Sequence, residues 1–320
     1  MAQVACLSPF SEEAVRDLFK GRHEVEIVIA PDPPAQEAIR DLVADADLVI
    51  GDRRHKHRID RPVLEAMRKV RLIQQPAVGF DVIDHRAAAE LGIPVANAAG
   101  YNRESVADWV LMAILNLLRL GSFGDRRMHE GQWPYSKMMG RELGSMTVGI
   151  LGLGNVGNAV ATRLRGFGAQ ILFTDVVGRS IAGAQQVGLG ELLDAANIVT
   201  IHVPLDKESR HLIDATALGR MQPGAILVNA ARGALVDQEA LVQALRSGRL
   251  AGAALDVYEE EPLAVESPLR SFDNVFMSPH VGGSTQEAER RVMDVCGDNM
   301  LRVLDGSDPL NIVNGVSRRR

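Results

Sequence analysis

The chain has 320 residues, which suits two domains of ordinary size better than one hydrophobic core. Its composition, 46% hydrophobic and 24% charged, is that of a globular protein, and its formal net charge of -6 provides no basic field to attract nucleic acid. We therefore expect a small-molecule ligand and no nucleic-acid partner.

The cysteine content and the apolar runs indicate the compartment of the protein and whether it binds a metal or a membrane. Only Cys6 and Cys296 are present, which is too few for a disulfide framework and lacks metal-site spacing, so we expect a cytoplasmic protein without a metal. The first residues lack the basic and apolar regions of a signal peptide, and the longest apolar run, at 109–118, is too short to span a bilayer. We expect no membrane partner.

Short apolar runs alternate with amphipathic segments, as in parallel strands joined by helical crossovers. In the first hundred residues we predict strands at 3–7, 24–29, 47–51, 71–75 and 93–97. Helices are predicted near 11–19, 34–45, 60–68 and 84–91. This first series indicates a small doubly wound unit.

A second series begins after an apolar helix near 103–120. Its predicted strands lie at 147–151, 170–174, 197–203, 225–230, 250–257 and 274–279. Six strands with intervening helices are typical of a complete dinucleotide-binding sheet. The amphipathic segment at 284–304 has no strand after it, so we expect it to return to the first unit. We predict an α/β fold with one discontinuous domain, 1–100 with 285–320, and another at 101–284.

A glycine-rich turn follows the first strand of the second series. Gly152, Gly154 and Gly157 form a GxGxxG pattern between a strand and a helix, where they permit a sharp turn and leave helix N–H groups for a pyrophosphate. An ordinary structural turn is the alternative. Asp175 ends the next strand, where a carboxylate binds ribose hydroxyls and repels the 2'-phosphate of NADP. The pattern predicts NAD as cofactor, while the nearby Arg179 leaves NADP open.

Three later strands are followed directly by charged or titratable side chains. Arg232 follows the fourth strand, Asp256 and Glu261 follow the fifth, and His280 follows the sixth. Ligands bind beyond the carboxyl ends of strands in open parallel sheets, and a guanidinium matches a carboxylate in two hydrogen bonds. The alternatives are an Arg232 that caps a helix or pairs with Asp237, and a structural histidine. An arginine, an acid and a histidine at the ends of three successive strands favour a ligand site over these alternatives.

Together these groups indicate a reductase of 2-oxo acids, or the reverse oxidation. Arg232 would bind the substrate carboxylate and polarise the carbonyl, and His280 would transfer the hydroxyl proton. Glu261 would support the protonated imidazole. The nicotinamide would carry the hydride.

These motifs resemble the D-isomer-specific 2-hydroxyacid dehydrogenase family. The resemblance extends over nearly the whole chain, through segments at 77–108, 149–157, 202–205, 229–237, 254–262 and 278–288. It implies an NAD-dependent enzyme with a Rossmann NAD-binding domain, a smaller flavodoxin-like substrate domain, and a homodimer formed through the helix near 103–120. The nearest likeness within the family is to 3-phosphoglycerate dehydrogenases, without their extra C-terminal regulatory domain. Asp108 departs from the glutamate that many members carry.

The resemblance also assigns roles to individual residues. It implies Arg232, Glu261 and His280 as the catalytic trio. The predicted cofactor site comprises Gly152, Gly154, Asn155, Val156, Gly157, Asp175, Val203, Pro204, Ala230, Arg232, Asp256, His280 and Gly282. The predicted substrate site comprises Arg53, Arg54, Val78, Gly79, Arg232 and His280.

The loop at 50–60 bears on substrate choice. It carries the basic residues Arg53, Arg54, His55, Lys56, His57 and Arg58. Family members use this loop to contact the part of the substrate remote from the carboxylate, and a basic cluster suits phosphate or a second carboxylate. A solvated charge run is the alternative. We expect a substrate with a second anionic group, similar to phosphoglycerate.

Other functions on the same scaffold stay open. These are a glyoxylate or hydroxypyruvate reductase, a phosphite dehydrogenase, and an NAD-sensing corepressor-like binding protein. Formate enzymes of this type carry Gln where this chain has Glu261, which argues against that activity.

Overall fold

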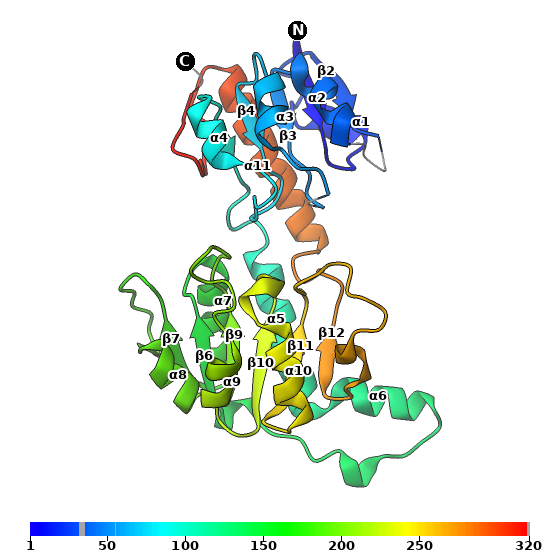
Figure 1. Cartoon of the computed structure of the whole chain (residues 1–320), viewed down its shortest axis with the longest axis vertical. Helices are drawn as coiled ribbons and strands as arrows, with labels where there is room; N and C mark the ends of the chain where they lie inside the picture. The colour runs from blue at the N-terminus through cyan, green and yellow to red at the C-terminus, as the bar shows by residue number, and fades with distance from the viewer. Residues whose placement is uncertain (32–35, 55, 319–320) are drawn as a thin grey trace. The chain divides into compact units, whose positions relative to one another are not determined.

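The computed structural model describes residues 1–31, 36–54 and 56–318 and divides into two compact units. One unit comprises Met1–Asn102 and Thr285–Arg320, and the other comprises Arg103–Ser284. Each unit is built on one parallel sheet with helices on both faces (Figure 1), so the predicted α/β fold class is confirmed. The first unit is assembled from both ends of the chain.

The sheet of the first unit has the strand order β2-β1-β3-β4-β5, and neighbouring strands are parallel. Its strands are β1 (Ala2–Cys6), β2 (Val25–Ile29), β3 (Leu48–Ile50), β4 (Leu72–Gln74) and β5 (Val95–Ala96). Its helices are α1 (Glu12–Asp17), α2 (Gln36–Ala44), α3 (Arg61–Ala66), α4 (His85–Glu90) and α11 (Gln286–Leu304). This order is the flavodoxin-like one.

Alternating side chains of β1 supply two separate cores in this unit, because successive residues of a strand face opposite sides of a sheet. Val4 and Cys6 pack with Cys296 of α11, whereas Ala5 packs with residues of α2, α3 and α4. A buried amide fixes the far end of α11, where the Asn299 Nδ2 donates to Gln74 Oε1 at 2.7 Å. The last long helix therefore completes the first unit.

The sheet of the second unit has the order β12-β11-β10-β9-β6-β7-β8, again with parallel neighbours. Its strands are β6 (Thr147–Leu151), β7 (Gln170–Thr174), β8 (Ala184–Gln186), β9 (Ile198–Ile201), β10 (Ala225–Asn229), β11 (Leu250–Leu255) and β12 (Val275–Met277). Its α-helices are α5 (Arg103–Arg119), α6 (Gly121–His129), α7 (Asn155–Gly166), α8 (Leu189–Ala195), α9 (Ala215–Arg220) and α10 (Gln238–Arg246). Four 3₁₀ helices join them: η1 (Tyr135–Lys137), η2 (Leu143–Ser145), η3 (Gly233–Leu235) and η4 (Pro268–Ser271).

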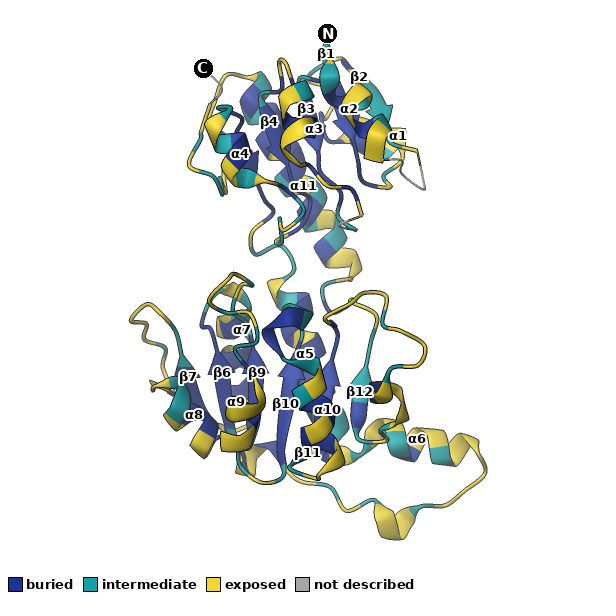
Figure 2. Cartoon of the chain, in the orientation of Figure 1, coloured by how far each residue is buried: buried dark blue, intermediate teal, exposed yellow. Residues whose placement is uncertain are grey.

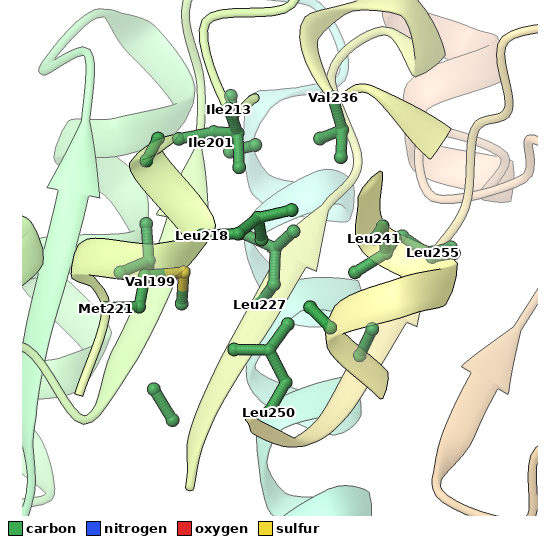
Figure 3. Close-up of a cluster of buried hydrophobic side chains, with 14 of the residues drawn as sticks. Val199, Ile201, Ile213, Leu218, Met221, Leu227, Val236, Leu241, Leu250 and Leu255 are labelled. Atoms are coloured by element: carbon green, nitrogen blue, oxygen red, sulfur yellow. The ribbon is translucent and has the colours of Figure 1, made fainter. Parts of the chain in front are cut away.

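Two hydrophobic cores cover the faces of this sheet (Figure 2). On one face, Val199 and Ile201 of β9 pack with Leu218 of α9 and Leu241 of α10 (Figure 3). On the other, Ile198, which precedes Val199 in β9, packs with residues of α5 and α7. Both faces of the strands are buried, which is why they read in sequence as continuous apolar runs.

The structure departs from the predicted elements in three places. The strand β8 was missed because its three residues, Ala184–Gln186, are largely exposed and carry no apolar run. The predicted helix at 34–45 corresponds to α2 (Gln36–Ala44), and its predicted start at residues 34 and 35 lies outside the described residues. The apolar helix α5 is buried largely within the core of its own unit, so its composition does not by itself require a partner.

None of the described helices is long and apolar enough on its own to cross a membrane. Only α5 and α6 taken together reach that length and composition, and they are bent by 66° at the break between them.

Candidate active site

The predicted cofactor and catalytic residues of the second unit lie along one edge of its sheet. All seven strands run in the same direction, so the loops after β6, β7, β9, β10, β11 and β12 emerge together at their carboxyl ends. Loops at this edge carry the ligand sites of open parallel sheets.

The glycine turn between β6 and α7 has the geometry that a dinucleotide needs. Gly152 has φ +87°, which disfavours other residues, and a Cβ on Gly157 would overlap the Gly152 carbonyl. At Gly154, by contrast, a Cβ would meet nothing within 4 Å. The space beside Gly154 is open for an approaching ligand, so the turn fits NAD.

The N-terminus of α7, like that of α8, has no side-chain cap. Helices α9 and α10 are capped by the side chains of Asp214 and Asp237, whose carboxylates accept backbone N–H groups. Gly154 caps α7 without a side chain, so the backbone N–H groups of the first turn, including those of Asn155 and Val156, are available to bind a ligand. Asp237, which the sequence offered as an alternative partner for Arg232, accepts the Ala240 N–H at 3.0 Å in its capping role.

Asp175, at the end of β7, is tied to the glycine turn. Its Oδ2 accepts the Leu153 N–H at 2.8 Å and its Oδ1 accepts the Val177 N–H at 3.1 Å, while Arg179 Nε donates to Oδ2 at 3.0 Å. Burial opposes ionisation, but the Val177 and Leu153 amides and the Arg179 charge together hold the pKa of Asp175 below its usual value. Asp175 is therefore an anion beside the turn, and Arg179 is held against it.

The loop after β9 packs against the glycine turn from the other side. A Cβ at Gly152 would lie 2.8 Å from the His202 carbonyl and 2.9 Å from Val203 Cγ1. His202 Nε2 lies 2.9 Å from Thr200 Oγ1, and burial lowers the pKa of His202 to about 3. This imidazole stays neutral, and Val203 with Pro204 follows it at the sheet edge.

Arg232 follows β10 in a loop that is organised by Asn229. The Asn229 Nδ2 donates to the Arg232 carbonyl at 2.9 Å, and its Oδ1 accepts the Ala231 N–H at 3.1 Å. Arg232 Nη1 also donates to the Ala231 carbonyl at 2.7 Å. The Asn229 side chain thus fixes the path of the chain into Arg232, and Ala230 lies in this loop.

His280 and Glu261 form a direct pair at the ends of β12 and β11. His280 Nδ1 lies 2.7 Å from Glu261 Oε2, and the other carboxylate oxygen accepts the Tyr258 N–H at 3.0 Å. With Nδ1 bound to the carboxylate, Nε2 is the ring nitrogen available for proton transfer.

The surroundings of Glu261 favour its ionised form. Burial raises its pKa, but the hydrogen bond and charge of His280, the Tyr258 amide and the charge of Arg232 outweigh burial and hold the pKa of Glu261 below its usual value. The loops of Arg232 and Glu261 are also in contact, because a Cβ at Gly233, the residue after Arg232, would overlap the Tyr258 carbonyl. The structure thus brings the three predicted catalytic residues into one site.

Asp256 organises the turn that carries His280. Its Oδ1 accepts the Ser278 hydroxyl at 2.5 Å and the Val281 N–H at 2.8 Å, and its Oδ2 accepts the Gly282 N–H at 2.7 Å. His280 itself has φ +55°, a left-handed conformation that a non-glycine residue adopts only when its surroundings hold it. The sequence predicts that Asp256 contacts the nicotinamide. In the structure both oxygens of its carboxylate already accept hydrogen bonds from the turn that carries His280.

The predicted substrate residues of the first unit lie after β3 and β4. Val78 is exposed, and its carbonyl accepts the Asn97 Nδ2 at 2.7 Å, which fixes the turn before Gly79. Arg53 Nη1 lies 2.7 Å from both oxygens of Glu289, and its guanidinium also lies over the Phe10 ring.

The rest of the basic loop is built around a buried carboxylate. Asp52 accepts the backbone N–H groups of Arg54, Lys56 and His57 at 2.9 to 3.1 Å and the His57 Nδ1 at 2.7 Å. Arg54 Nε lies 3.7 Å from the same carboxylate. His57 is buried, and His55 lies outside the described residues. The loop is thus not a freely solvated charge run, and two of its cations are paired within the first unit.

Three residues that hold the loops of the second unit were not predicted, Asn229, Tyr258 and Ser278, and in the first unit the role of Asp52 in the basic loop was not predicted either. Asn229 is the last residue of β10 and Asp52 comes two residues after β3, so a polar side chain at or just beyond a buried strand was the signal in the sequence that could have identified them. Tyr258 and Ser278 act through tertiary contacts, which no local pattern in the sequence indicates. Across residues 1–31, 36–54 and 56–318, no group of three or more His, Cys, Asp or Glu side chains could hold a metal ion.

Comparison with known proteins places these residues in context. Residues 111–282 match the family model described as D-isomer specific 2-hydroxyacid dehydrogenase, NAD binding domain. The chain is 37% identical to a glyoxylate reductase from Korarchaeum cryptofilum over 309 residues, which cover 93% of this chain and 92% of the relative.

A second relative is longer than this chain. The sequence is 36% identical to a D-3-phosphoglycerate dehydrogenase from Archaeoglobus fulgidus over 98% of this chain but 59% of the relative, so the chain spans about three fifths of that protein. Among solved structures, a glyoxylate reductase from Paecilomyes thermophila has a TM-score of 0.89 and 27% identity, covering 98% of both chains.

We predict that Asp175→Ala changes cofactor preference. The substitution removes the acceptor of the Leu153 amide and releases Arg179, whose freed guanidinium would attract a 2'-phosphate. The ratio of the NADH and NADPH dissociation constants should shift toward NADPH by about tenfold or more. Titration of both cofactors measures this ratio, with Asp194→Ala, an exposed aspartate paired with Arg220, as control. An unchanged ratio would remove Asp175 from the cofactor site.

Proposed function

Because the chain belongs to the D-isomer-specific 2-hydroxyacid dehydrogenase family, we propose that it interconverts a small D-2-hydroxy acid and the corresponding 2-oxo acid. It is an NAD-dependent oxidoreductase, and bound NAD supplies or accepts the hydride. The observation that carries the proposal is the 2.7 Å pair of His280 with Glu261, beside Arg232, at the carboxyl edge of the NAD-binding sheet.

The three side chains divide the work in this proposal. Arg232 binds the substrate carboxylate and polarises the carbonyl oxygen through charge-assisted hydrogen bonds. His280 Nε2 gives a proton to the forming hydroxyl in reduction, or takes it in oxidation. Glu261 holds Nδ1 and stabilises the imidazolium, since it stays ionised with a lowered pKa.

The cofactor residues have a separate role. The open turn at Gly154 and the first turn of α7 bind the pyrophosphate, and Asp175 binds the adenosine ribose. The neighbouring positions Val203, Pro204, Ala230 and Gly282 line the path of the dinucleotide along the sheet edge.

We expect His280→Ala to lower kcat for 2-oxo acid reduction by about 10²-fold or more, the usual worth of a general acid. NADH affinity should stay nearly unchanged, because the imidazole acts on the substrate. Steady-state turnover and NADH titration measure the two effects, and His129→Ala, an exposed histidine on α6, is the matched control. A kcat equal to that of the wild type would assign the proton transfer elsewhere.

For the substrate, we propose first a small 2-oxo acid of the glyoxylate or hydroxypyruvate class. A second anionic group would have to compete with Glu289 for Arg53 and with Asp52 for Arg54, since both carboxylates already lie beside these cations. The similarity to a glyoxylate reductase over nearly its full length supports the same choice.

A phosphorylated substrate similar to 3-phosphoglycerate is the second candidate. Two observations favour it: Arg53 and Arg54 keep 28% and 27% of their side-chain surface exposed, and a phosphoglycerate dehydrogenase is among the relatives. A doubly charged phosphate is a stronger acceptor than a carboxylate and could displace one.

The two candidates differ in the effect of Arg53→Ala and Arg54→Ala. If the first is right, kcat/KM for glyoxylate and for 3-phosphohydroxypyruvate should change by the same factor, within about threefold. A selective loss of about tenfold or more on the phosphorylated substrate would establish the second. Arg40→Ala on α2 serves as the control for loss of a surface charge, and thermal unfolding checks the folding of each variant.

We also propose a homodimer, with the segment around α6 and η1 as the interface. This segment projects from its unit (Figure 1) and carries exposed apolar side chains, including Trp133 at 78% and Met139 at 90% exposure. A cavity of about 200 Å³ at its base is lined in part by Leu117, Leu120 and Phe123. A second copy of the chain, presenting the same side chains, would fill and cover this apolar surface.

Sedimentation should therefore give the mass of a dimer for the wild type, and Trp133→Glu should shift it toward the monomer. A buried, unpaired carboxylate in an apolar interface is strongly unfavourable. Val176→Glu, which alters another exposed apolar residue of the same unit, should leave the mass unchanged. A wild-type monomer at micromolar concentration would contradict the proposal.

A reducing cytoplasm is the compartment we propose, because Cys6 and Cys296 are both free and buried. Fractionation of cells that express the chain checks this.

A further inference from the structure

The three loops that carry the proposed catalytic residues all meet at one residue, Tyr258, through its backbone and its side chain. This residue follows β11 and is 8% exposed. Its backbone N–H donates to Glu261 Oε1 at 3.0 Å. Its carbonyl lies so close to Gly233 that a Cβ there would overlap it, which packs the Tyr258 loop on the loop of Arg232.

The hydroxyl of Tyr258 makes the connection to the third loop. Its Oη lies 3.0 Å from the Ser278 carbonyl and 3.2 Å from the Leu255 carbonyl. A hydroxyl has one proton to donate, and the Ser278 carbonyl is the nearer acceptor. Ser278 stands two residues before His280, so this bond links the end of β11 to the turn that carries the imidazole.

The side chain of Ser278 is held by two further hydrogen bonds. Its hydroxyl donates to Asp256 Oδ1 at 2.5 Å and accepts the Trp109 Nε1–H of α5 at 3.0 Å. The backbone also holds this turn, because the Ser278 N–H donates to the Leu255 carbonyl at 3.0 Å and the His280 N–H donates to the Asp256 carbonyl at 2.7 Å. The bond from the Tyr258 hydroxyl to the Ser278 carbonyl is the side-chain contact that Tyr258 adds to these, and it ties the turn to the residue whose N–H binds Glu261.

Packing alone does not account for the hydroxyl. Phenylalanine would fill almost the same volume without the cost of burying a polar group. Burial raises the pKa of Tyr258 to about 12, so the hydroxyl keeps its proton and remains a donor at physiological pH. The nearby Asp256 carboxylate raises the same pKa, and Arg270 lowers it.

We propose that the Tyr258 hydroxyl is a positioning group for the reaction, which fixes the His280 imidazole against Glu261 by holding the Ser278 carbonyl. This inference rests on the proposed function, because it assigns the proton transfer to His280. It does not make Tyr258 a catalytic residue, since the hydroxyl acts through the backbone of the turn.

The test compares Tyr258→Phe with the wild type, and uses Thr216→Val as the control for loss of a hydroxyl, because Thr216 is exposed on α9 of the same unit. Tyr258→Phe should lower kcat for 2-oxo acid reduction about tenfold, the worth of one well-placed hydrogen bond. NADH affinity and KM should change by less than about threefold, because the side chain lies away from the glycine turn. Thr216→Val should change none of these quantities.

A second readout does not depend on turnover. The ¹⁵N chemical shift of His280 Nδ1, assigned with His280→Asn, reports its hydrogen bond to Glu261 and should move in Tyr258→Phe. If kcat and this shift both equal those of the wild type, the proposal is overturned, even where the melting temperature falls. If the wild type lacks turnover on every 2-oxo acid, the proposed function fails, and the Nδ1 shift still decides whether Tyr258 positions the imidazole.

Discussion

The parallel alignment of the strands is the constraint on which this site depends. In the seven-stranded sheet of the second unit every strand ends at the same edge, so the loops that follow β6, β10, β11 and β12 lie side by side. Gly154 and His280 are far apart in the chain but follow strands of one sheet. A guanidinium, a carboxylate and an imidazole on neighbouring strand ends can therefore act on one ligand.

A second principle recurs in the loops themselves. Beyond a strand end the backbone loses its ladder partners, and a buried polar side chain supplies hydrogen bonds instead. Asp256 does this for the His280 turn, Asn229 for the Arg232 loop, and Asp52 for the basic loop of the first unit. Each of these loops is consequently fixed before any ligand arrives, which reduces the cost of ordering it on binding.

The basic loop shows how pairing changes the meaning of charge. Its sequence carries a run of cations, yet Arg53 is paired with Glu289 of α11, which is contributed by the far end of the chain. The same ion pair links the loop to the helix that completes the first unit. The number of cations in the loop therefore overstates the positive charge that is available to an anionic substrate. Family membership does not decide the substrate class, which the variants of Arg53 and Arg54 would test.

The sequence by itself determined the fold class, the family, the NAD cofactor and the strand ends that carry Arg232, Glu261 and His280, because apolar periodicity and glycine spacing are local in the chain. It could not determine the short exposed strand β8, which lacks an apolar run. The pairing of Arg53, the burial of α5 within its own unit and the bond of Tyr258 to Ser278 were decided by tertiary structure alone. Each of these joins residues that are distant in sequence, and a hydrogen bond or ion pair of that kind exists only when the folded backbone brings its two partners together.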